Sequence, residues 1–213
     1  SGIVSSQNKI YEVIQSSSSF RPESKPAARS KLGISGALIY LWVGRLEKNK
    51  DPLTVVKAFI RFHSVHPSVR LYMIYQTNEL LEEVKALINV NDQKGEAIRL
   101  VGKVPHEALQ SWYSSADFIV SGSHYEGSGI AVSEAMSCGC IPVVTDIISF
   151  RKMAGTCGLF YKPGDENALV NVLEHTLELD VEDERKKVLD EFQKELSFAA
   201  IAEKINYIIT ENG

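Results

Sequence analysis

The sequence predicts an α/β domain built on a doubly wound parallel sheet, with extra helices at its C-terminal end. Five short apolar runs recur along the chain, and most are continuous; they span residues 38–43, 69–74, 98–101, 118–120 and 141–144. A strand covered by helices on both faces has no side in water, so continuous apolar runs are typical of parallel sheets. Segments with apolar residues at helical spacing separate these runs, as repeated βαβ units require.

The helices can be placed in chain order between and after the strands. The first begins at Pro52 behind Asp51, since proline suits the first helical position and an aspartate side chain can cap it. Gly139 ends a later helix, as glycine often does. The other predicted helices span residues 80–88, 105–114, 128–137, 165–177 and 181–196, and a last one follows Ser197.

The first thirty-six residues differ in composition from the rest. They predict a short helix over residues 7–14 and then a polar stretch with a serine run, Pro22 and Pro26, which is typical of an interdomain linker. We therefore expect residues 1–36 to be an N-terminal helix and linker remnant, and residues 37–213 to form the Rossmann-like domain with its C-terminal helices.

Composition excludes several classes of protein. The chain has 23 lysine and arginine residues and 27 acidic residues, a net charge of −4. This balance lacks the excess of positive charge that is typical of proteins that bind nucleic acid. The longest apolar run, residues 37–43, is far shorter than the ~20 residues that span a bilayer. Cys138, Cys140 and Cys157 lack paired metal-ligand spacing, so we expect no metal site and a reducing, cytoplasmic location.

A glycine loop carries the most informative pattern. Glu126-Gly127-Ser128-Gly129 follows the strand at 118–120 and leads through Ile130 into a helix that contains Glu134. Ligands of open α/β sheets bind at the carboxyl ends of strands. Free N–H groups at a helix start favour phosphate, and carboxylates accept hydrogen bonds from sugar hydroxyls. The loop is therefore a candidate site for a phosphorylated sugar ligand.

Two cationic side chains follow the first strand. Gly44 and Arg45 come at its carboxyl end, and Lys50 lies five residues further on. An arginine offers a planar fork and a lysine a point charge, so together they could neutralise a diphosphate. A turn around Val104 joins the third strand to its helix, and it is a candidate wall of a nucleobase pocket.

In this order the motifs resemble the C-terminal domain of a GT-B glycosyltransferase of family 4, the retaining "group 1" enzymes. The resemblance covers residues 20–207, and its most specific element is the pair of glutamates eight residues apart. The other matching residues are Gly44, Arg45, Lys50, Gly102, Ala116, Asp117, the run 135–139, Pro142, Gly158, Pro163, Gly164 and Ser197.

The resemblance implies a transferase of the hexosyltransferase type that uses a UDP-, GDP- or ADP-sugar and needs no metal or cofactor. It assigns the donor diphosphate to Arg45 and Lys50 beside Gly44, the donor sugar to Glu126 and the ribose to Glu134. Backbone donors come from Gly127, Ser128, Gly129 and Ile130, and Val104 lines the base pocket. The catalytic residues it implies are Glu126, Arg45 and Lys50.

Three departures from the family pattern stand out. Ser128 replaces an aromatic or other apolar residue, and Ile148-Ser149 stand where the family usually has two glycines. No acceptor-binding α/β unit precedes Ala37, so the chain resembles half of an enzyme that in full length could act at a membrane surface.

The alternative to the glycosyltransferase prediction is a non-catalytic α/β nucleotide-binding or regulatory module. A dinucleotide oxidoreductase is disfavoured, because no GxGxxG pattern follows the first strand.

Overall fold

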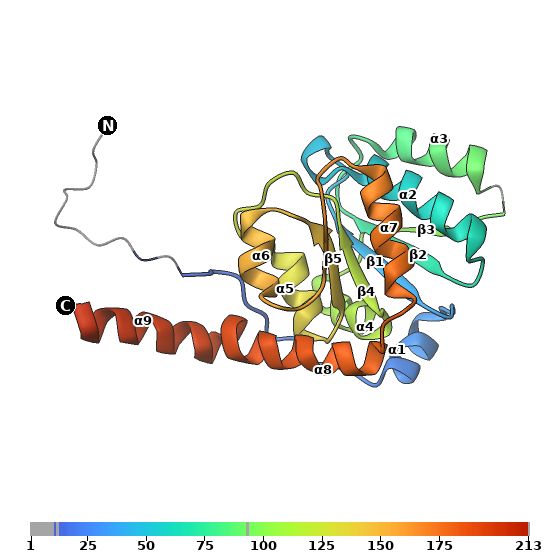
Figure 1. The fold of residues 1–213 in the computed structure, drawn as a ribbon. Helices are drawn as coiled ribbons and strands as arrows, with labels where there is room; N and C mark the ends of the chain where they lie inside the picture. Colours follow the sequence, from blue (N-terminus) through green and yellow to red (C-terminus); the bar gives the residue numbers. More distant parts are fainter. Residues whose placement is uncertain (1–10, 12, 93, 213) are drawn as a thin grey trace, which may run out of the picture.

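The computed structural model describes residues 11, 13–92 and 94–212, and it confirms the doubly wound α/β prediction (Figure 1). All strand pairs of the six-stranded sheet are parallel, in the order β3-β2-β1-β4-β5-β6. The strands are β1 (Ile39–Gly44), β2 (Arg70–Tyr75), β3 (Ile98–Gly102), β4 (Phe118–Ser121), β5 (Ile141–Thr145) and β6 (Leu159–Tyr161). The first five match the predicted apolar runs. The sixth is a three-residue edge strand, too short to leave a pattern in the sequence.

The central strand β1 pairs with β2 on one side and with β4 on the other. Tyr40 sits opposite Leu71 in one ladder and opposite Phe118 in the other. The chain therefore adds β2 and β3 on one side of β1, and then returns to add β4, β5 and β6 on the other side. This order is that of dinucleotide-binding folds, which bind ligands where the order reverses.

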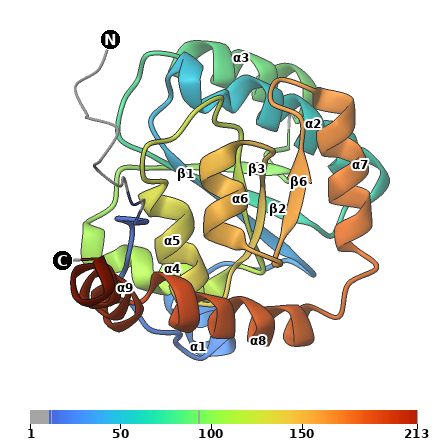
Figure 2. The same ribbon diagram turned by 60° about the vertical axis from the view of Figure 1, so that its left-hand side comes forward.

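Helices cover both faces of the sheet (Figures 1 and 2). One face carries α2 (Pro52–Val65), α3 (Leu81–Asn91) and α7 (Glu166–Thr176), which pack around α2. The other carries α1 (Lys25–Leu32), α4 (Leu109–Ser115), α5 (Ile130–Ser137) and α8 (Val181–Glu191), which pack in a row. Shorter elements are the 3₁₀ turns η1 (Lys48–Lys50) and η2 (His106–Ala108) and the π-helical turn η3 (Phe192–Leu196). The helices α6 (Ile148–Ala154) and α9 (Phe198–Asn212) complete the set described.

Beyond residue 37, the predicted helices are confirmed with two changes of detail and one addition. The helix expected over 105–114 begins as the 3₁₀ turn η2, and the one over 181–196 ends in the π-helical turn η3. The added helix is α6, which begins at the exposed Ile148. Asp51 caps α2 as expected, because its Oδ1 accepts the Thr54 N–H at 3.2 Å.

Aromatic packing joins the sheet to α2. The Tyr40 ring stacks on Phe118 of the neighbouring strand with centroids 4.9 Å apart, and it meets Phe59 edge-on at 5.2 Å. Burial raises the pKa of Tyr40, so its phenol stays protonated and bonds with the Thr176 hydroxyl of α7. Tyr40 thereby joins α2 and α7 to the middle of the sheet.

The N-terminal expectation needs two corrections. Most of the helix expected over residues 7–14 lies outside the described residues, but Tyr11, Val13 and Ile14 are described and form no helix. Ile14 instead packs as irregular chain against the hydrophobic core. The polar stretch expected to be a linker contains α1, in whose first turn Pro26 is accommodated.

Asp117 explains why α1 forms. Its carboxylate is 4% exposed and accepts hydrogen bonds from Lys25 Nζ, Arg29 Nη2 and the Ile39 N–H, each at 2.7 Å. One side chain at the start of β4 therefore joins α1 to the start of β1. The sequence pattern missed this helix because tertiary ion pairs, and not its own apolar stripe, stabilise it.

The last helix, α9, continues beyond the edge of the sheet and carries exposed apolar side chains, among them Phe198, Tyr207 and Ile209 (Figure 1). Within the part of the chain that the structure describes, no helix is both long and apolar enough to cross a membrane.

We predict that Asp117→Ala lowers the free energy of unfolding by about 3 kcal/mol, because it removes the buried carboxylate between two partly buried cations and leaves Arg29 without it while Lys25 keeps only the exposed Glu182. Urea unfolding of both forms measures this change. The control is Asp183→Ala, which removes an exposed carboxylate that pairs with Lys187 on the surface of α8. An Asp117→Ala variant no less stable than the control would contradict the role given to this network.

Candidate functional site

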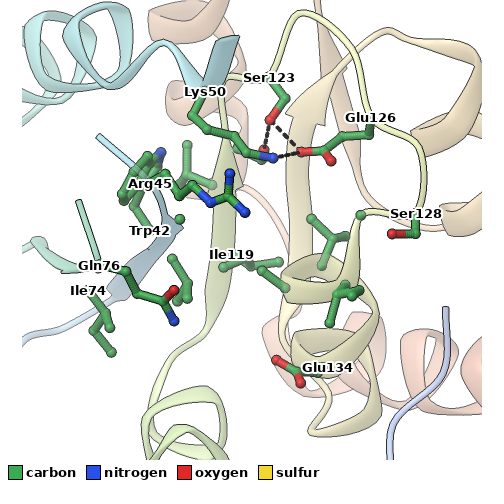
Figure 3. A pocket seen from close by; sticks show the side chains of 18 of the residues that line it. Trp42, Arg45, Lys50, Ile74, Gln76, Ile119, Ser123, Glu126, Ser128 and Glu134 are labelled. Carbon is green, nitrogen blue, oxygen red and sulfur yellow. Dashed lines mark hydrogen bonds and ion pairs between the residues drawn. The ribbon is translucent and has the colours of Figure 1, made fainter. Parts of the chain in front are cut away.

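A pocket of about 640 Å³ opens at the carboxyl ends of β1 and β4, where the strand order reverses (Figure 3). Its volume lies within the range of small-molecule sites. All ten residues that the sequence singled out line it: Gly44, Arg45, Lys50, Val104, Glu126, Gly127, Ser128, Gly129, Ile130 and Glu134. The structure thus brings together three separate segments of the chain, residues 44–50, Val104 and residues 126–134, around one cavity.

The turn after β1 delivers Arg45 to the pocket. A Cβ at Gly44 would lie 3.1 Å from the Trp42 ring, so glycine lets the chain turn closely over that buried side chain. The Arg45 side chain is 63% exposed, and Glu47 approaches its guanidinium only to 3.8 Å. In Figure 3 the guanidinium points into the cavity. Arg45 is therefore held only loosely by protein groups and can bind an anion.

Lys50 and Glu126 are in direct contact. The Lys50 ammonium forms an ion pair with Glu126 Oε1, and the Ser123 hydroxyl donates to the same oxygen at 2.7 Å (Figure 3). Both charged side chains are largely buried, at 22% and 13% exposure. The sequence predicted both residues as site residues but not their contact, because seventy-six positions separate them.

Glu134 lies on α5 and faces the same cavity. Its carboxylate is buried, and its Oε1 is 2.7 Å from His106 Nε2 while its Oε2 accepts the Tyr113 hydroxyl at 3.0 Å. Burial, and then the nearby Glu134 carboxylate, raises the pKa of Tyr113 well above its usual value. The phenol therefore remains a hydrogen-bond donor, and the orientation of Glu134 is fixed from two sides.

His106 was not predicted as a site residue, although it lines the pocket and contacts Glu134. No local pattern could have identified it, since it belongs to η2 and its partner to α5, twenty-eight residues away. Trp42, Gln76 and Tyr113 also line the pocket and were not predicted as site residues.

The glycine loop brings the backbone of α5 to the cavity. Gly129 has φ +59°, and a Cβ there would lie 2.8 Å from Met153 of α6. The positive φ therefore favours glycine, and a larger residue would also have to displace the end of the Met153 side chain. Among the described residues, no side chain caps the start of α5, so its first two N–H groups remain open to a ligand. The Ser128 carbonyl accepts a bond from the Ser16 hydroxyl, which ties the N-terminal segment to the loop.

The pocket is chemically polarised. Arg45, Lys50 and Glu126 gather at one end (Figure 3), whereas apolar side chains form much of the remaining wall. The apolar wall consists of Trp42, Ile74, Val104, Leu109 and Ile119. Among the residues that the structure describes, no group of three or more His, Cys, Asp or Glu side chains is placed to hold a metal ion.

Two solved structures share this fold. A complex of Anabaena HepE with UDP and glucose matches with a TM-score of 0.74 at 16% identity, over 88% of this chain and 52% of that one. The C-terminal domain of a glycosyl transferase group 1 family protein from Francisella tularensis matches with a TM-score of 0.68 at 18% identity. That match covers 87% of this chain and 95% of the Francisella domain.

Sequence comparison identifies the family. The D-inositol 3-phosphate glycosyltransferase of Streptosporangium roseum is 32% identical over 168 residues, which are 72% of this chain and 38% of that protein. The chain therefore spans well under half the length of this relative. The family described as "Glycosyl transferases group 1" matches residues 24–196. With most of its length matched in this way, the chain belongs to the glycosyl transferases group 1 family.

Proposed function

We propose that this chain is the donor-binding domain of a retaining glycosyltransferase of family 4, which moves a sugar from a nucleoside-diphosphate sugar to an acceptor. The observation that carries the proposal is the polarised pocket at the β1/β4 reversal. Two cations and an uncapped helix start surround one part of it, and a buried, oriented carboxylate lies in another. A nucleoside-diphosphate sugar has the complementary arrangement of phosphate charge and hydroxyl groups.

The diphosphate would bind between Arg45, Lys50 and the start of α5. The arginine fork suits phosphate oxygens, and the lysine adds a point charge. The free N–H groups after Gly129 contribute further donors. As the glycosidic bond breaks, the departing diphosphate gains negative charge, so these groups stabilise the transition state more than the bound donor.

Glu134 is placed to accept hydrogen bonds from the ribose hydroxyls. Because His106 and Tyr113 hold its carboxylate, little side-chain freedom is lost when the ribose binds. The wall that includes Val104 would contact the base. A buried carboxylate that already has two donors also disfavours a second negative charge nearby, which keeps the diphosphate at the cationic end.

Glu126 would lie against the donor sugar, where we assign it an orienting and electrostatic role. Its Oε1 already has two donors, Lys50 and Ser123, which makes it a weaker nucleophile than a free carboxylate. We further propose that a second Rossmann-like domain, which binds the acceptor, completes the enzyme, and that no metal or other cofactor takes part.

Calorimetric titration with UDP, GDP, ADP and NAD tests the proposed function. We expect one nucleoside diphosphate to bind more tightly than the other two, and each to bind more tightly than NAD, because a free diphosphate carries more negative charge toward Arg45 and Lys50 than the doubly esterified diphosphate of NAD. Failure of all three diphosphates to bind would contradict the donor-binding proposal and favour the regulatory-module alternative.

Two substitutions test the assigned site. Arg45→Ala and Glu134→Ala should each weaken binding of the preferred nucleotide by about tenfold or more, since hydrogen bonds to charged groups contribute ~1.5–3 kcal/mol. The same titration measures this loss. The control is Arg61→Ala, which removes an exposed arginine that pairs with Glu166 outside the pocket. Equal affinities for all forms would show that the nucleotide binds elsewhere.

The stereochemical proposal has its own test. In a preparation that contains the acceptor-binding domain, we expect the product to keep the anomeric configuration of the donor sugar. Proton NMR of the first turnover products reads the configuration directly, before any slow equilibration. An inverted product would contradict the retaining mechanism while leaving donor binding intact.

A further inference from the structure

We propose that Asn49 is a positioning residue, which clamps the turn that carries Lys50 to the loop that carries Glu126. We call residues 48–51 the cation turn and residues 122–126 the carboxylate loop. The clamp is a structural inference from this chain, and its effect on ligand binding rests on the function proposed above.

The Asn49 side chain makes two of the three hydrogen bonds of the clamp, and its backbone makes the third. Asn49 Nδ2 donates to the Tyr125 carbonyl at 3.1 Å, and Asn49 Oδ1 accepts the Tyr125 N–H at 3.2 Å. The amide thus pairs with both backbone groups of one residue, as a neighbouring strand would. The Asn49 carbonyl also accepts the His124 N–H at 2.9 Å. Three hydrogen bonds from a single residue therefore join the two segments.

The neighbouring residues show how closely the segments approach. Asp51 Oδ2 lies 3.2 Å from His124 Nε2, so a further side-chain contact follows directly after Lys50. A Cβ at Gly122 would be only 2.9 Å from the Asp51 carbonyl oxygen and 3.0 Å from that of Lys50. Glycine at position 122 therefore permits the contact that Asn49 maintains.

The cation turn is held in an unfavourable conformation. Asp51 has φ +41°, and it is the single non-glycine residue with positive φ among those the structure describes. Such a residue persists where its surroundings hold it. Here the α2 cap, His124 and the three bonds of Asn49 supply that support.

The clamp acts one residue away from each charged group. Asn49 precedes Lys50, and Tyr125 precedes Glu126, so the hydrogen bonds fix the separation at which the ammonium and the carboxylate meet. When a diphosphate takes part of the Lys50 charge, the ion pair with Glu126 must weaken. The bonds of the neutral amide do not depend on that charge, and they keep both segments in place while Lys50 changes partner.

Three variants test the clamp. Asn49→Ala removes both side-chain bonds, whereas Asn49→Asp has the same shape and keeps an acceptor for the Tyr125 N–H. The matched control is Asn91→Ala, which removes an amide that donates to the Leu87 carbonyl on α3, away from the pocket. Because Asn49 lies in a surface turn, we expect all three to fold, which the urea midpoint of each variant checks.

The first readout needs no ligand. Hydrogen exchange of the Tyr125 amide, followed by NMR, should become about tenfold faster or more in Asn49→Ala, as expected when a local opening costs less. It should rise less in Asn49→Asp, which keeps the acceptor for the Tyr125 N–H but turns a carboxylate oxygen toward the Tyr125 carbonyl, and it should stay near the wild-type rate in Asn91→Ala. An unchanged Tyr125 exchange rate in Asn49→Ala would overturn the clamp.

The second readout is the affinity for the nucleoside diphosphate that the wild-type chain prefers. We expect about a tenfold loss in Asn49→Ala, with no loss in Asn91→Ala. Faster exchange together with unchanged affinity would overturn the positioning role. If the wild-type chain binds no nucleotide, the proposed function fails, and the exchange rates alone decide whether Asn49 joins the two segments.

Discussion

The reversal of strand order between β1 and β4 is the constraint on which the arrangement of the site depends. The chain leaves β1 toward α2 on one face of the sheet and leaves β4 toward α5 on the other (Figures 1 and 2). The two connections therefore diverge and leave a crevice at the carboxyl ends of these strands. Arg45 and Lys50 enter it from one side, and Glu126 and Glu134 from the other.

The crevice is organised without a ligand because its charged groups already have protein partners. Lys50 pairs with Glu126, and His106 and Tyr113 bond to Glu134. Unpaired charges in so buried a site would be costly. Arg45 differs, since it is mostly exposed and only distantly paired. Under the proposed function, Arg45 would be the first contact of an incoming diphosphate and Lys50 the group that exchanges partners.

Much of the sheet and the outline of the pocket were predictable from local patterns. Most of the runs that predicted β1 to β5 are continuously apolar, although Arg70 and Arg99 interrupt two of them. The glycine loop at Gly127–Gly129 lies at a strand end by its position alone. What could not be predicted depends on contacts between distant residues. Asp117 binds Lys25 and Arg29 of α1, His106 contacts Glu134, and Asn49 binds Tyr125. In each of these contacts the two partners lie far apart in the sequence. No sequence spacing encodes such contacts.

The location of the site is tested most directly by NMR. The measurement maps the chemical-shift changes that follow addition of the nucleoside diphosphate that binds most tightly. If the diphosphate lies in the crevice, the largest shifts will occur in the amides of residues 44–50 and 126–134, on both sides of the strand-order reversal. Shifts concentrated instead between α2 and α3, around the groove that Leu53, Leu87 and Val90 line, would contradict this location.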